Sequence, residues 1–165
     1  TLRPCKEESK DWDTTENLYI EGDNLDVLKL LQESYLRAVK VIYIDPPYNT
    51  GNDFLYLDKF NMTTDEYDEA VEYIDEEGLI QFKKNDISHP RYHSKWCSMM
   101  YPRLQVAKNI LADDGVIFVS IGDAELTNMQ KMCDEVFGAM NFIAIVPRLM
   151  KTGGNKGRFF SPNID

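Results

Sequence analysis

The most informative stretch of this sequence is Val39-Lys40-Val41-Ile42-Tyr43-Ile44-Asp45-Pro46-Pro47-Tyr48. Its first six residues are mostly β-branched or aromatic, a pattern typical of a buried strand. Proline has no N–H for a sheet ladder and restricts the residue before it to extended geometry, so the strand must end at Asp45. The two prolines therefore hold the Asp45 carboxylate, the Pro46 carbonyl and the Tyr48 ring in a nearly fixed arrangement at the edge of a sheet.

Predicted strands and helices alternate on both sides of this stretch. Leu18 to Ile20 is predicted as a short strand, and Leu25 to Leu36 as a helix. Downstream we predict a helix over 94–111 that is kinked or split at Pro102, a turn at 113–115, a buried strand over 116–121, a helix over 124–137 that ends at Gly138, and a strand over 142–146. This alternation predicts an α/β domain with a mostly parallel sheet and right-handed crossovers.

Polar residues follow three of the predicted strands, at Gly22-Asp23-Asn24, at Asp45 to Tyr48, and at Ser120 to Asp123. In parallel sheets ligands bind outside the carboxyl ends of the strands, so all three groups should open on the same edge. Asp23 and Asp123 each precede a predicted helix, where aspartate is a preferred N-cap. A capping role and a ligand-binding role therefore both stay open for these two residues.

The arrangement at Asp45 to Tyr48 suits one kind of chemistry. An amine attached to an aromatic ring is a poor nucleophile because its lone pair is delocalised into the ring. A carboxylate and a backbone carbonyl that accept its two N–H groups would localise the lone pair and favour the developing positive nitrogen. Tyr48 would offer a surface on which a flipped-out base can stack. The four residues alone also fit a bare turn with a surface tyrosine.

Composition excludes several classes of protein. A chain of 165 residues that is 43% hydrophobic can build one domain with a real core. The net charge of −10 excludes a generally basic nucleic-acid coat protein. No apolar run is long enough to span a bilayer, and the first ten residues have no signal-peptide core. Three cysteines and two histidines match no metal-binding spacing, so we expect reduced thiols, no metal and a cytoplasmic protein.

Charge is divided unevenly along the chain. Residues 1–80 hold 20 acids and 7 bases, whereas residues 81–165 hold 8 acids and 11 bases. Eight of the acids lie in 65–77, where Thr63 and Glu66 form a capping pair. We predict a helix there with one solvated acidic face, and an acid-rich ligand site is the alternative.

At this point a family resemblance becomes specific. The segment Val41 to Gly51, V-I-Y-I-D-P-P-Y-N-T-G, resembles the catalytic segment of the amino-group DNA methyltransferases, and the D-P-P-Y form resembles that of the adenine-N6 enzymes. The flanking segments 21–25, 93–104 and 114–121 are similar to those of the β-group enzymes, in particular the modification subunits of type III restriction systems. The resemblance extends from about residue 17 to residue 142.

The resemblance implies a Rossmann-like methyltransferase fold and the transfer of a methyl group from S-adenosylmethionine to N6 of a flipped-out adenine in double-stranded DNA. It implies catalytic roles for Asp45, Pro46, Pro47 and Tyr48, and cofactor contacts from Gly22, Asp23, Asn24 and Asp45. Candidate DNA contacts are Asn49, Arg91, His93, Lys151, Lys156 and Arg158. It also implies a prokaryotic cytoplasmic protein without a membrane partner, a restriction subunit as a possible partner, and a homodimer of the full-length protein.

The chain also departs from the family. It has no glycine-rich F-x-G-x-G segment for the methionine end of the cofactor, and no room for a large target-recognition region. We therefore expect an N-terminal catalytic piece of a longer protein, inactive alone. Its expected parts are an N-terminal extension at 1–16, the catalytic part at 17–147 with a polar excursion at 49–93, and a basic glycine-containing tail at 148–165. A cytosine-N4 or RNA-base methyltransferase, and a degenerate protein-binding module, are the alternatives.

Overall fold

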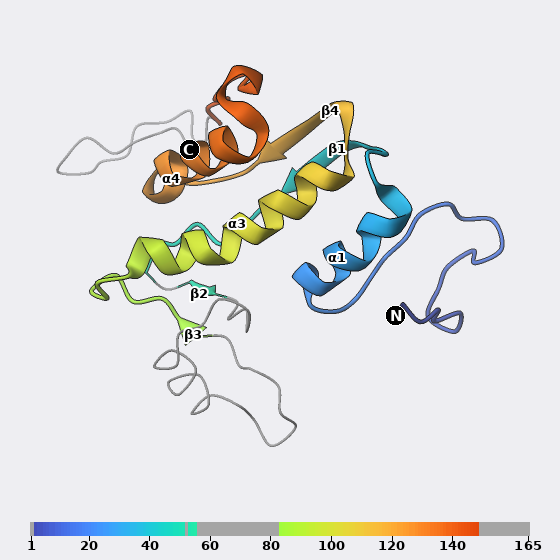
Figure 1. The fold of residues 1–165 in the computed structure, drawn as a ribbon. Helices are drawn as coiled ribbons and strands as arrows, with labels where there is room; N and C mark the ends of the chain where they lie inside the picture. Colours follow the sequence, from blue (N-terminus) through green and yellow to red (C-terminus); the bar gives the residue numbers. More distant parts are fainter. Residues whose placement is uncertain (1, 52, 56–82, 149–165) are drawn as a thin grey trace.

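The computed structural model describes residues 2–51, 53–55 and 83–148, in which two strands, β1 (Val39–Ile44) and β4 (Leu111–Val119), form a parallel sheet beside the long helix α3 (Tyr92–Ile110) (Figure 1). Strand β1 pairs with strand β4, with Ile42 opposite Ile117 and Ile44 opposite Val119. The predicted strand over 39–44 is confirmed. The expected α/β class and parallel pairing are confirmed as well, for a sheet of two strands in the described residues.

Helix α3 (Tyr92–Ile110) is the longest element and packs between helix α1 and helix α4 (Figure 1). Nine of its residues are buried, among them Trp96, Met99 and Met100, as their shared helical face predicts. Pro102 lies inside the helix and does not split it, so that half of the expectation was wrong. Proline costs the helix a hydrogen bond, but burial on both sides of Pro102 keeps the element continuous.

Helix α1 (Asn24–Tyr35) begins where the sequence predicts. The side chain of Asp23 caps it by accepting from the N–H of Asp26 at 3.0 Å. Two hydrogen bonds between side chains fasten the helix to α3. Arg103 Nε donates to Asn24 Oδ1 at 2.7 Å, and Asn109 Nδ2 donates to Gln32 Oε1 at 2.9 Å. The amino end of α1 is therefore tied to the middle of α3.

Helix α4 (Asp123–Cys133) continues into a π-helical turn, η2 (Asp134–Gly138), and a 3₁₀ turn, η3 (Ala139–Asn141). The predicted helix over 124–137 is thus confirmed, with its last turn widened. Gly138 ends it at φ +92°, a conformation that glycine adopts without strain. The core lies between α3, α4 and the sheet, and its buried members are Leu55, Trp96, Met99, Met100, Leu104, Met129, Met132 and Val136.

The expected turn at 113–115 lies within β4 as a break in the register. Val39 pairs with Leu111 but Val41 pairs with Val116, so one residue of β1 faces several residues of β4. Gly115 lies there in close quarters, because a Cβ would come within 2.8 Å of the Leu111 side chain and 3.0 Å of the Ala112 carbonyl. Lys40 and Asp114 form an ion pair across this break, and the hydrogen bond from Lys40 lowers the pKa of Asp114.

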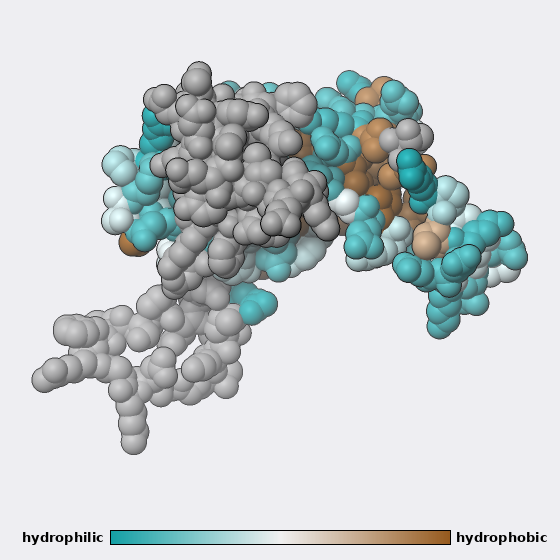
Figure 2. Space-filling view, turned by 90° about the horizontal axis from the view of Figure 1, so that it is seen from below, coloured by the Kyte–Doolittle hydropathy of each residue, from teal (hydrophilic) through white to brown (hydrophobic). Residues whose placement is uncertain are grey.

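Two expected strands do not form, and a third is less buried than predicted. Residues 18–20 and 142–146 run as irregular, largely exposed chain, because no strand of the described residues pairs with them. Within the pair β1–β4, the side chains of Val41, Tyr43 and Phe118 are all more than half exposed. A parallel sheet is normally covered on both faces, and here one face is open. Figure 2 shows hydrophobic side chains reaching the surface between hydrophilic ones.

The polar excursion is described at its two ends. Strand β2 (Phe54–Leu55) pairs antiparallel with strand β3 (Lys83–Lys84), and Leu55 is buried against α3. The helix predicted over 65–77 lies outside the described residues. Within the described ranges, no helix has the length and apolar character needed to cross a membrane.

Candidate active site

The carboxyl ends of β1 and β4 meet at one edge, as predicted. The Ser120 N–H donates to the Ile44 carbonyl at 3.0 Å, and the hydroxyls of Tyr43 and Ser120 lie 2.6 Å apart. The Tyr48 ring packs over Gly122, where an added Cβ would be 3.4 Å from Tyr48 Cδ2. The loop after β1 therefore folds back over the loop after β4.

Asp45 and Tyr48 face each other within this loop. Asp45 is exposed and Tyr48 is partly buried. Burial raises the pKa of the Tyr48 phenol, and the hydrogen bond with Asp45 and the Asp45 charge raise it further, against a smaller opposing effect of Ser120. The raised pKa favours the neutral phenol beside Asp45.

A buried tryptophan of α3 anchors the Asp45–Tyr48 loop. Trp96 is 0% exposed, and its indole Nε1 donates to the Pro47 carbonyl at 2.7 Å. Proline has no N–H, so this carbonyl and the fixed φ angle set the path of the chain. No hydrogen bond among the described residues engages the Pro46 carbonyl, which stays available as an acceptor. The loop is therefore anchored through the Pro47 carbonyl, and the Pro46 carbonyl is left as an acceptor.

The next residue, Asn49, is 1% exposed and adopts φ +57°. Its Nδ2 donates to Glu125 Oε1 at 2.5 Å, and its Oδ1 accepts from Asn85 Nδ2 at 2.8 Å. Its backbone carbonyl accepts from the Tyr92 hydroxyl. Asn49 was expected to contact DNA, which stays a prediction; its side chain is enclosed and hydrogen-bonded to Glu125 and Asn85.

Glu125, from the first turn of α4, is the buried centre of this arrangement. The side chain is 0% exposed. Besides Asn49, it accepts from Asn128 Nδ2 at 2.7 Å, and His93 Nδ1 lies 2.6 Å from its Oε1. We call Asn49, Asn85, Tyr92, His93, Glu125 and Asn128 the Glu125 network. Sequence reasoning missed it, because a glutamate in a first helical turn usually faces solvent and no spacing signals otherwise.

The predicted cofactor residues at 22–24 are not joined to this loop by any hydrogen bond among the described residues. Asp23 acts as the N-cap of α1, which confirms one of its two predicted roles, and its side chain is exposed. Asn24 is held by Arg103. The expected capping role of Asp123 was wrong: Gly122 occupies the N-cap position and Asp123 is the first helical residue. Its charge still favours the amino end of α4.

Of the five other residues predicted to contact DNA, two are described and three lie outside the described residues. Arg91 is exposed at the N-cap position of α3. The His93 side chain is 58% exposed, although its Nδ1 faces Glu125. Lys151, Lys156 and Arg158 lie outside the described residues. Arg91 and His93 thus stand near the Asp45–Tyr48 loop at the start of α3, since Tyr92 between them bonds to Asn49.

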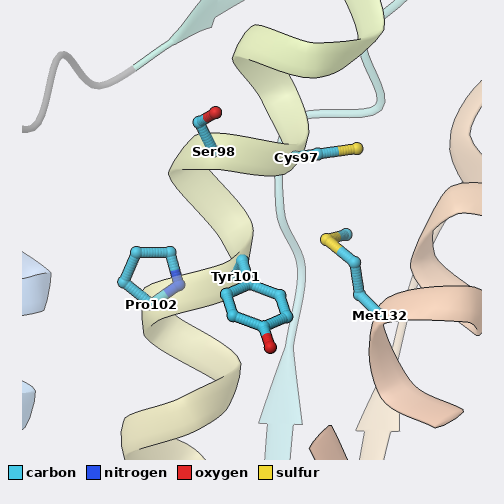
Figure 3. Close-up of a pocket in the computed structure, with 5 residues that line it drawn as sticks. All are labelled: Cys97, Ser98, Tyr101, Pro102 and Met132. Carbon is cyan, nitrogen blue, oxygen red and sulfur yellow. The ribbon is translucent and has the colours of Figure 1, made fainter. Parts of the chain in front are cut away.

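A hollow of about 290 Å³ lies between α3 and α4 (Figure 3). It is lined by Cys97, Ser98, Tyr101, Pro102 and Met132, with the sulfur atoms of Cys97 and Met132 turned toward each other. None of these side chains is charged, and burial raises the pKa of the Cys97 thiol, which favours its neutral form. The hollow is not part of the strand edge. In the described part of the chain, no cluster of histidine, cysteine or carboxylate side chains could hold a metal ion.

Comparison with known proteins gives a consistent result. A family model of N6/N4 methyltransferases, described as DNA methylase, matches residues 39–164. The chain is 42% identical over 157 residues to the Mod subunit of the type III restriction-modification enzyme EcoPI from Escherichia phage P1, covering 93% of this chain and 23% of that protein. It is 46% identical over 131 residues to the StyLTI Mod subunit of Salmonella typhimurium, covering 79% and 20%.

A more distant relative is the type II methyltransferase M.KpnI of Klebsiella pneumoniae, 34% identical over 146 residues, which are 87% of this chain and 29% of that protein. The chain thus spans about a fifth to a quarter of the length of the type III Mod subunits it matches.

Proposed function

This chain belongs to the N6/N4 DNA methylase family, and on that premise we propose that its Asp45–Tyr48 loop is the acceptor site of a DNA adenine-N6 methyltransferase. One observation carries the proposal. An exposed carboxylate, a carbonyl open at Pro46 and an aromatic ring stand together at the carboxyl end of β1, on a loop anchored by a buried tryptophan. This is the arrangement that an exocyclic amine requires.

The residues of this chain would act by binding and orientation. The Asp45 carboxylate and the Pro46 carbonyl accept the two N–H groups of the amine, so that its lone pair points outward and its developing positive charge is stabilised. The Tyr48 ring stacks on the flipped-out base. Pro47, held by Trp96, keeps these groups in register. Since the amine is held in one orientation, proximity supplies much of the rate.

The donor of the methyl group in this proposal is S-adenosylmethionine, which supplies a methyl group on a sulfonium. The chemistry of the exposed Asp23 fits its adenosine end, because one carboxylate oxygen caps α1 and the other can accept from a hydroxyl. Gly22 and Asp45 would complete the contact. Asn24 fits less well, since its side-chain oxygen is already taken by Arg103. No described residue is assigned to the methionine end.

Adenine is favoured over cytosine as the acceptor by the D-P-P-Y order and by the similarity to type III Mod subunits. For the longer protein we propose a Rossmann-like domain that includes residues 17–147, double-stranded DNA as substrate, and a restriction subunit and a second copy as partners. We expect the 165-residue segment alone to transfer no methyl group, because its described sheet has two strands and one open face.

The test is an analysis of product. The longest form of the protein is incubated with double-stranded DNA and S-adenosylmethionine, and the digested nucleosides are separated by mass spectrometry, with DNA incubated without protein as control. The proposal predicts N6-methyladenine. N4-methylcytosine would move the acceptor to cytosine, and absence of any methylated base would favour a degenerate protein-binding module.

A further inference from the structure

We propose that Glu125 is a positioning residue for the acceptor loop, which it holds in the base-binding geometry through Asn49. The inference rests on the proposed function, since it assumes that the loop binds the target base. Glu125 itself is enclosed by its neighbours and does not touch the acceptor edge. Its effect would reach the base through one residue, the direct neighbour of Tyr48.

The charge of Glu125 is the first step of the argument. A buried carboxylate is costly unless hydrogen bonds compensate it. Three side-chain nitrogens, from Asn49, His93 and Asn128, lie 2.5 to 2.7 Å from its oxygens. A glutamine would offer one acceptor oxygen instead of two, so the carboxylate is the better match to this set of donors. An apolar side chain would leave all three donors without their partner.

The second step is the position of Asn49. Its left-handed backbone is uncommon for a residue other than glycine, and it is kept by contacts to the carbonyl, to Nδ2 and to Oδ1. Consecutive Cα atoms are about 3.8 Å apart, so a shift of Asn49 moves Tyr48 with it. The loop continues to Thr50, whose hydroxyl donates to Asp53 at 2.8 Å.

The third step is that the network joins three separate elements, with Asn85 added from the segment after β3. Asn49 comes from the loop after β1, Tyr92 and His93 from the first turn of α3, and Glu125 from the first turn of α4. The rings of Tyr92 and His93 meet edge to face, with centroids 4.9 Å apart. Glu125 links α4 to both the loop and α3, so it sets the position of these two elements relative to α4.

The experiment swaps donor and acceptor in the hydrogen bond between Asn49 and Glu125, in the longest form of the protein. Asn49 donates to Glu125, so the double variant Asn49→Asp/Glu125→Gln restores a hydrogen bond with donor and acceptor reversed, and the new carboxylate would still accept from Asn85. Glu135→Gln is the matched control, because Glu135 is an exposed glutamate that accepts from Tyr101 at the far end of the same helical segment. Single-turnover methyl transfer and hydrogen–deuterium exchange of residues 48–53 are measured.

We expect Glu125→Gln to lower the transfer rate by about 10- to 100-fold, the scale of a misplaced reacting group, with binding of DNA unchanged. Asn49→Asp alone should be worse, because it buries two carboxylates in contact. The double variant should recover most of the loss, and Glu135→Gln should match the wild type. Amide exchange should speed up in residues 48–53 and at the start of α3 only.

Three results would overturn the inference: a wild-type rate in Glu125→Gln, losses that simply multiply in the double variant, or faster exchange throughout the protein. The last would mean a general role in folding. Failure of the proposed function is distinguishable, because then the wild type itself transfers no methyl group. In that case the exchange pattern alone decides whether Glu125 positions the loop.

Discussion

The loop at Asp45–Asn49 and the residues Gly22–Asn24 are both predicted to follow strands at one edge, but the two segments differ in how they are held. The first is fixed by a buried tryptophan and by the Glu125 network, which come from α3 and α4. The second follows the exposed Leu18 and Tyr19 and has one capping bond and one bond to α3. Among the described residues, the acceptor side of the proposed reaction is thus preorganised, and the residues proposed for the cofactor side are held by fewer contacts.

The largest effect should come from Asp45→Ala in the longest form of the protein. It removes the carboxylate that stabilises the developing positive charge, so methyl transfer should fall by roughly 100- to 1000-fold, the loss typical of removing one such group. Radiolabelled methyl transfer to DNA measures it. The control is Asp113→Ala, an exposed aspartate paired with Arg37 at the other end of the sheet. Equal losses in both variants would refute a special role for the acceptor loop.

A smaller effect is expected for Tyr48→Ala, which removes the stacking surface. Stacking of a base on an aromatic ring contributes about 1–3 kcal/mol, so transfer should fall by roughly 10- to 100-fold. Tyr48→Phe keeps the ring and should keep most of the activity. A loss in Tyr48→Phe as large as in Tyr48→Ala would assign the role to the hydroxyl.

Wild type and Tyr48→Phe can also be compared as a function of pH. Burial and Asp45 raise the pKa of Tyr48, so the folded protein retains the phenol proton at a pH where the unfolded chain loses it. The contribution of Tyr48 to stability is therefore full below the ordinary phenol value of about 10 and falls as the pH rises above it. Chemical denaturation at several pH values should show wild type losing stability relative to Tyr48→Phe above that value. A constant difference would contradict the raised pKa.

Trp96→Phe tests the anchor of the acceptor loop. It removes the donor to the Pro47 carbonyl and part of a fully buried ring, so the free energy of unfolding should fall by about 1–3 kcal/mol. Urea denaturation measures the change. Trp12→Phe is the matched control, because Trp12 is exposed and should change stability by no more than about 0.5 kcal/mol. If both substitutions cost the same, the loop does not depend on this anchor.

The smallest effect is expected at the other strand end, where two substitutions separate the two roles of Asp23. Asp23→Ala loses the cap and should cost about 0.5–2 kcal/mol of stability. Asp23→Ser keeps a capping oxygen but removes the carboxylate. Calorimetric titration of S-adenosylmethionine should then show weaker binding for both variants, with normal stability only for Asp23→Ser. Unchanged binding in both would leave Asp23 with the capping role alone.

The sequence predicted local features of the fold well. The strand ending at Asp45 and the helices predicted over 25–36 and 124–137 follow from apolar periodicity, a capping aspartate and two prolines, all of which act within a few residues. The predictions of strands at 18–20 and 142–146 were wrong, because a strand needs a second strand to pair with and residue propensity does not show whether one is present. The prediction that Pro102 splits the helix was wrong, because packing on both sides of α3 outweighs the hydrogen bond that proline removes.

The candidate site divides in the same way. Asp45, Pro46, Pro47 and Tyr48 could be singled out because prolines fix backbone geometry locally. The Glu125 network could not, because its bonded members lie up to 76 positions apart and meet through tertiary packing. Asn49 shows the difference within one residue: its place beside the motif was visible in the sequence, but its burial under α3 and α4 was not.

The most direct test of the central claim is photo-cross-linking to a flipped-out base. Once the methylated site is known, 5-iodouracil replaces the target adenine in a short duplex, and the complex with the longest form of the protein is irradiated and digested. An aromatic ring stacked on the base is the expected partner, so the account predicts a cross-link at Tyr48 that is lost in Tyr48→Ala. A cross-link at another residue, for example Tyr43 or Tyr92, would contradict the assignment of the acceptor site to the Asp45–Tyr48 loop.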